Sequence, residues 1–149
     1  MVITFCGHSQ AVFTEEEKQR VYDIIESEII KYPDCVFYLG AYSDSDTLFK
    51  ITIDLLKAKY KNIKTVFVTP YLDDNYTKLK FAKDFYDDVI YPPLENVPKR
   101  YAIIKRNQWM VDNSDLLIAY VKLSFGGASK TLEYAKRKGK PYINVAKRA

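Results

Sequence analysis

Two glycines between a strand pattern and a helix pattern mark the place where this sequence could do chemistry. The stretch from Ser124 to Glu133 reads SFGGASKTLE and follows the apolar run Leu116–Val121. Glycine lets the backbone approach a ligand closely, and the first amides of a helix have no partner within that helix. These amides and the helix dipole favour a phosphate group. The alternative is a tight turn that binds nothing, because a Gly-Gly turn alone is a weak motif.

Two other turns rich in small and polar residues follow apolar runs in the same way. Gly7-His8-Ser9 follows Val2–Cys6, and Gly40 to Asp46 follows Cys35–Leu39. In open parallel sheets, ligands bind beyond the carboxyl ends of the strands, where the strand order switches direction. The agreement of three such turns therefore predicts a ligand site at one edge of a sheet.

Three side chains near these turns could serve either a ligand or the fold. His8, the single histidine, is either a hydrogen-bonded structural residue or a ligand contact. Arg106 shares one side of a predicted helix with Met110, and a buried arginine needs an anionic partner, which a phosphate would supply. Asp46 is either a helix cap or an acceptor for a sugar hydroxyl.

The elements that must position these residues alternate between strand and helix patterns. Several strands are apolar without alternation, as strands buried on both faces are. The predicted strands are Val2–Cys6, Cys35–Leu39, Thr65–Thr69, Val89–Tyr91, Leu116–Val121 and Pro141–Val145. The pattern predicts an α/β fold, Rossmann-like and doubly wound, with a mostly parallel sheet of five to six strands and helices on both faces.

The predicted helices carry start and stop signals. Thr14 and Glu17 form a capping box before the first helix, and Pro33 ends that segment. The second helix is expected to bury Leu48, Ile51, Leu55 and Leu56, a loop and a short helix are expected around Thr77 to Asp84, and Pro98 opens a helix to about Asp112. The last helix is expected over Thr131 to Lys138, stopped by Gly139, with Glu133 in its first turn or so.

The totals suit one domain over residues 1–149 and exclude several classes of protein. Apolar residues make up 48% of the chain and charged residues 28%, and no apolar run approaches the roughly 20 residues of a membrane span. The net charge of +4 slightly favours anionic small molecules and is too weak to predict a nucleic-acid partner. Cys6 and Cys35 are expected to be free buried thiols in a reducing, cytoplasmic compartment, and their spacing predicts neither a metal site nor a bound cofactor.

Four stretches of the sequence together resemble a known group of proteins. They are Gly7-His8-Ser9, Tyr38 to Asp46, Lys105 to Asp115, and Gly126 to Glu133. The chain is similar to a small family of the SLOG superfamily, which joins the Lonely Guy (LOG) proteins to the DNA-processing protein DprA. The resemblance covers nearly the whole chain and implies a Rossmann-like fold that binds nucleotides or nucleotide-derived ligands. It also implies a homo-oligomer.

The resemblance further implies a possible reaction. LOG enzymes cleave the N-glycosidic bond of nucleoside 5′-monophosphates with an arginine and a glutamate, and Arg106 and Glu133 match these by position. This chain departs from the LOG glycine motif, with Ser124-Phe125 where the proline would be, Ser129 in the place of its third glycine and Lys130 in the place of its threonine. These departures preserve a phosphate-binding turn and favour binding over catalysis.

Three hypotheses follow for the function. In the binding hypothesis, the amides from Gly126 to Thr131 and the hydroxyls of Ser129 and Thr131 hold a phosphate, and Gly40 to Asp46 hold a second phosphate or a ribose. In the enzyme hypothesis, Glu133 stabilises the oxocarbenium charge and Arg106 fixes the 5′-phosphate. The third is an interaction role without a small ligand. The residues expected to contact the ligand are Gly7, His8, Ser9, Gly40, Asp46, Asn107, Gly126, Gly127, Ala128, Ser129, Lys130 and Thr131.

Overall fold

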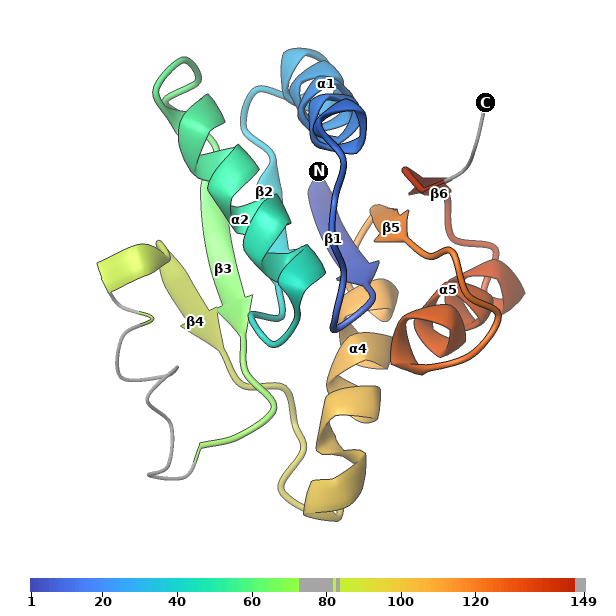
Figure 1. Ribbon diagram of the computed structural model, residues 1–149. Coiled ribbons are helices and arrows are strands. Elements are labelled where there is room, and N and C mark those ends of the chain that lie inside the picture. The colour runs from blue at the N-terminus through green and yellow to red at the C-terminus, as the bar shows by residue number, and fades with distance from the viewer. Residues whose placement is uncertain (73–81, 83, 147–149) are drawn as a thin grey trace.

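A computed structural model describes residues 1–72, 82 and 84–146 of the chain. Within them, six strands form one sheet with the order β4-β3-β2-β1-β5-β6, and every neighbouring pair is parallel (Figure 1). The strands are β1 (Val2–Gly7), β2 (Val36–Leu39), β3 (Lys64–Val68), β4 (Asp88–Ile90), β5 (Leu116–Tyr120) and β6 (Tyr142–Asn144). The predicted α/β, Rossmann-like fold is confirmed.

The helices cover both faces of this sheet. They are α1 (Glu15–Lys31), α2 (Asp44–Lys57), α4 (Ala102–Asp112) and α5 (Gly127–Arg137), with a short 3₁₀ helix η1 (Lys99–Tyr101) before α4. Successive side chains of a strand point to opposite faces. Phe5 of β1 therefore packs in the core with residues of α1 and α2, and the next residue, Cys6, packs with residues of α4 and α5. No helix in the described part of the chain is long and apolar enough to cross a membrane.

The start of α1 follows the predicted capping box. The Thr14 hydroxyl accepts a hydrogen bond from the Glu17 amide, and the Glu17 carboxylate accepts one from the Thr14 amide, each at 3.0 Å. The predicted buried face of α2 was half wrong. Leu56 is buried, but Ile51 is 53% exposed and Leu55 is 62% exposed. The helix instead buries a stripe one position away, with Phe49, Thr52, Ile53 and Leu56 facing the sheet.

The last helix begins four residues earlier than predicted. Gly127 is the first residue of α5, and Glu133 therefore lies in its second turn and not its first. Gly139 has a φ of +69°, which fits its predicted role in ending this helix. Most of the segment predicted to hold a loop and a short helix around Thr77 to Asp84 falls outside the described residues.

Candidate functional site

A cavity of about 420 Å³ opens where the strand order switches between β1 and β5. The chain leaves β1 toward one face of the sheet and β5 toward the other, which leaves a gap beyond their carboxyl ends. The turns after β1, β2 and β5 and one side of α4 form its walls. Most of the predicted site residues line it, namely Gly7, His8, Ser9, Gly40, Asp46, Arg106, Asn107, Gly126, Gly127 and Ala128. We refer to it as the switch-point cavity.

The amino-terminal end of α5 forms one wall of this cavity. Gly126 stands just before the helix with φ 96° and ψ 175°, a conformation that is essentially restricted to glycine. Gly127 is the first residue of α5, and a Cβ atom added to it would meet no atom outside its own stretch of the helix within 4 Å. Neither packing nor backbone strain therefore explains why residue 127 is glycine.

Four predicted site residues lie away from the cavity wall, because α5 starts early. Ser129 is buried, Lys130 is exposed, and the Thr131 hydroxyl donates to the Gly127 carbonyl oxygen at 2.9 Å. The Glu133 side chain is 57% exposed, and its carboxylate lies 3.5 Å from the Lys136 ammonium. The structure thus brings Gly126, Gly127 and Ala128 to the cavity and directs Glu133 to the outer surface of the helix.

Arg106 crosses the edge of the sheet and is only 2% exposed. Its Nη1 donates to the carbonyl oxygens of Gly40 at 3.0 Å and Val68 at 2.7 Å, and its Nε donates to Asn107 Oδ1 at 2.9 Å. Burial lowers the pKa of Arg106, and the nearby Asp46 charge opposes that shift. The arginine predicted to need a phosphate is therefore largely occupied in joining the ends of two strands.

Two glycines bring the amino-terminal end of α2 against this edge. A Cβ atom at Gly7 would overlap the Ser45 side chain, and one at Gly40 would lie 2.9 Å from Arg106 Nη2. Ser43 caps α2 by accepting from the Asp46 amide at 2.9 Å, and Asp46 Oδ2 accepts from the Tyr42 amide at 3.1 Å. Asp46 is thus a carboxylate in the first turn of a helix, and its charge lies close to that of Arg106.

The imidazole ring of His8 accepts hydrogen bonds from the backbone of the turn after β5. Its Nε2 accepts from the Lys122 amide at 2.8 Å and from the Leu123 amide at 3.2 Å. Burial lowers the pKa of His8, and the Lys122 charge lowers it further, so the ring is held in its neutral form. The sequence offered a structural role and a ligand contact for His8. The geometry shows a structural role at the cavity wall.

A charged cluster that sequence reasoning missed anchors the same turn. The Lys122 ammonium lies 2.8 Å from Glu17 Oε2, and the Tyr120 hydroxyl donates to the same oxygen at 2.6 Å. Burial alone would raise the pKa of Glu17, but hydrogen bonds from Lys122 and Tyr120 lower it to about 2. Glu17 was predicted only as a capping residue, and nothing in its spacing to residues 120 and 122 indicates the contact.

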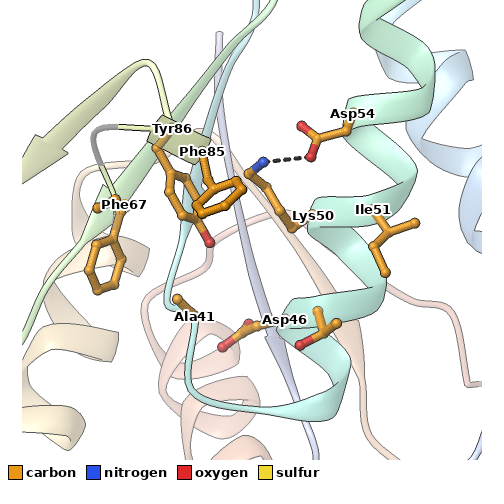
Figure 2. A pocket seen from close by; sticks show the side chains of 10 residues that line it. Ala41, Asp46, Lys50, Ile51, Asp54, Phe67, Phe85 and Tyr86 are labelled. Atoms are coloured by element: carbon orange, nitrogen blue, oxygen red, sulfur yellow. Dashed lines mark hydrogen bonds and ion pairs between the residues drawn. The ribbon is translucent and has the colours of Figure 1, made fainter. Parts of the chain in front are cut away.

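A second cavity, of about 360 Å³, lies between α2 and three residues after β3, namely Ala82, Phe85 and Tyr86, and Asp46 borders both cavities (Figure 2). Figure 2 shows the Lys50 side chain reaching Asp54, at 2.6 Å, beside the rings of Phe85 and Tyr86. The Lys50 ammonium also lies 4.8 Å from the centre of the Tyr86 ring. Burial, and then the charges of Asp46 and Asp54, raise the pKa of Tyr86 to about 12. Residues 71–86 have no clean hydrophobic period, so no sequence pattern predicted this cavity. Across the described residues, no three His, Cys, Asp or Glu side chains gather as metal ligands would.

No protein-family model matches the chain. One curated relative is the uncharacterized SPbeta prophage-derived protein YoqJ of Bacillus subtilis (strain 168). It is 25% identical over 137 residues, which cover 80% of each protein.

Solved structures share the fold at low sequence identity. The DNA processing protein A (DprA) of Streptococcus pneumoniae matches with a TM-score of 0.66 at 16% identity over 94% of this chain, and that of Helicobacter pylori matches with 0.65 at 17% over 95%. The chain spans 48% and 63% of these two proteins. A molybdenum cofactor carrier protein from Chlamydomonas reinhardtii matches with 0.57 at 16% identity, over 95% of this chain and 73% of that protein. The neighbours support a DprA-like Rossmann fold.

Proposed function

We propose that the protein is a SLOG-type domain that binds a phosphate-bearing, nucleotide-derived small molecule in the switch-point cavity and senses or sequesters it. The observation that carries the proposal is that the amino-terminal end of α5 lines the cavity with Gly126, Gly127 and Ala128, and that neither packing nor backbone strain explains the glycine at 127. The first amides of a helix and the helix dipole attract phosphate. A cavity of about 420 Å³ also lies within the usual size range of small-molecule sites.

The charges around the cavity favour a ligand with its negative charge at one end. Arg106 is close to Asp46 and occupied by two carbonyl oxygens, so its charge is largely offset. The amino-terminal end of α5 then contributes the positive end of a helix dipole to the cavity wall. Ile103, Met110 and Phe125 contribute apolar surface to the same cavity, which suits the base of a nucleotide.

Three contacts favour binding over the LOG-like hydrolase reaction. Glu133 lies on the outer face of α5 and pairs with Lys136, Arg106 holds the ends of β2 and β3, and His8 holds the turn after β5. A general acid, a general base or a stabilising carboxylate must reach the reacting atoms. Glu133 and Arg106, the residues expected to act in cleavage, are thus engaged in contacts within the protein. A protein that senses or sequesters a ligand needs no catalytic residue.

Single-stranded DNA is the competing ligand, because the Helicobacter pylori DprA structure concerns its single-stranded DNA binding mode. The mild net charge of +4 favours a small anion over a nucleic acid. The salt dependence of the affinity distinguishes the two ligands, since a protein that neutralises several DNA phosphates loses affinity steeply as the salt concentration rises.

The first experiment is native mass spectrometry of the purified protein, followed by denaturation and identification of released small molecules. The same spectra test the expected homo-oligomer. Calorimetry with AMP, ADP-ribose and a single-stranded oligonucleotide then ranks the ligand classes, with Gly127→Ala as the matched variant. A retained or added nucleotide that Gly127→Ala no longer holds supports the proposal. The proposal is wrong if no nucleotide binds, or if only the oligonucleotide does.

A further inference from the structure

The ring of His8 anchors the start of the turn over residues 122–126 through hydrogen bonds. Its Nε2 accepts from the amides of Lys122 and Leu123 at 2.8 and 3.2 Å. A neutral imidazole accepts at one ring nitrogen and carries its proton on the other, so the proton of His8 lies on Nδ1. A second proton, on Nε2, would face two N–H groups and break both hydrogen bonds.

Three contacts hold His8 itself in place. Its amide donates to the Tyr120 carbonyl oxygen at 3.3 Å, and its carbonyl oxygen accepts from the Ser45 hydroxyl at 2.9 Å. Its ring meets the Tyr120 ring edge-on, with 6.2 Å between the centres. β5 and α2 therefore fix the ring, and the ring fixes the turn that leads to Gly126 and Gly127.

We propose that His8 is a positioning residue for the ligand, whose neutral ring places the 122–126 turn so that the end of α5 can receive an anion. Protonation of the ring releases the turn and weakens binding in acid. The effect on ligand binding rests on the proposed function, and the effect of the ring on the 122–126 turn does not.

Charged and titratable groups lie on each of the elements packed against His8. They are Lys122 on the turn, Glu17 on α1, Asp44 and Asp46 on α2, and Tyr120 on β5. The Glu17 carboxylate is occupied by Lys122 and Tyr120, and the Asp44 carboxylate accepts from the Ala11 amide at 3.0 Å. Burial and then the Lys122 charge lower the pKa of His8 below 6.5. The hold on the turn is thus complete above pH 6.5 and is lost as the pH falls through the lowered pKa.

NMR of the ring tests the first step directly, because the chain contains one histidine and its signals need no assignment among others. The inference requires a pKa below 6.5 and the tautomer with its proton on Nδ1. A pKa at or above 6.5, or a proton on Nε2 at neutral pH, would overturn it.

Hydrogen exchange at Lys122 and Leu123 tests the second step without any ligand. Their protection factors should fall by about fivefold as the pH is lowered through the ring pKa that NMR measures, the equivalent of about 1 kcal/mol for one hydrogen bond. The variant His8→Gln keeps an acceptor that does not titrate, so its protection should be independent of pH. The variant His8→Leu lacks the acceptor and should be unprotected throughout. Equal pH dependence in wild type and His8→Gln would refute the role of the ring.

ADP-ribose tests the third step, because its bridged diphosphate does not titrate in this range as a phosphate monoester does. Wild-type affinity should fall about fivefold as the pH is lowered through the same ring pKa, again the effect of about one hydrogen bond, and His8→Gln affinity should not. If ADP-ribose binds neither protein at pH 7, the proposed function loses its support, and the exchange data still decide the role of His8. A pH-independent wild-type affinity would refute the link between the turn and the ligand.

Discussion

Replacing Gly127 with alanine separates what the fold requires from what a ligand requires. Gly127 opens α5, and a Cβ atom there would meet no atom outside its own stretch of the helix within 4 Å. Alanine has the higher helix propensity, by about 1 kcal/mol in a helix interior and less at the first position. We therefore expect Gly127→Ala to leave the free energy of unfolding unchanged or to raise it by up to about 1 kcal/mol.

The same methyl group should weaken ligand binding. It would project into the open space beside the first amides of α5, where a phosphate must come within hydrogen-bond distance. The loss of one hydrogen bond to a charged group costs about 1.5 to 3 kcal/mol, so affinity should fall about tenfold or more. Urea denaturation measures the stability, and calorimetry with AMP or ADP-ribose measures the affinity.

Gly126→Ala is the matched control. Gly126 has φ 96° and ψ 175°, a region that costs other residues about 1 to 3 kcal/mol, so this variant should lose stability and affinity together. The reasoning is refuted if Gly127→Ala binds as wild type does. It is also refuted if Gly127→Ala is as unstable as Gly126→Ala, because residue 127 would then serve the fold.

Three further substitutions have expected outcomes. Arg106→Lys should cost about 2 kcal/mol in urea denaturation, because an ammonium does not reproduce the guanidinium contacts to two strand ends. Glu17→Gln should remove stability that wild type keeps above pH 4.5 and loses as the pH falls toward 2, which acid titration followed by circular dichroism measures. Glu133→Gln should change stability by less than about 0.5 kcal/mol and leave nucleotide affinity unchanged in calorimetry.

The strands could be predicted from the sequence because a strand that is buried on both faces is a continuous run of apolar residues. Phe5 packs toward α1 and α2 and Cys6 toward α4 and α5, so consecutive residues are both apolar. The capping box at Thr14 and the end of α5 at Gly139 were equally local signals. Elements whose signals lie within a few neighbouring residues were thus predicted correctly.

The phase of α2 and the start of α5 could not be predicted in this way. α2 is apolar over a wide arc, and only the tertiary packing selects Phe49 and Ile53 over Ile51 and Leu55 as its buried residues. Two glycines weaken the helix pattern at the start of α5, because glycine has low helix propensity. The helix nevertheless begins at Gly127, where Gly126 supplies the special backbone geometry that precedes it.

The candidate site shows why side-chain patterns predicted the place of the cavity better than the role of each residue. His8 and Arg106 were selected as residues that could contact a ligand, and both line the cavity, yet both bond to backbone groups. The proposal therefore assigns the phosphate to backbone amides at the amino-terminal end of α5, and backbone amides leave no mark in a sequence because almost every residue has one. A glycine can indicate in the sequence that a ligand comes close to such amides. The indication holds only where neither packing nor a positive φ accounts for the glycine. Of the five glycines, Gly7 and Gly40 are explained by packing and Gly126 and Gly139 by their φ, which leaves Gly127 as the residue that the proposed ligand would explain.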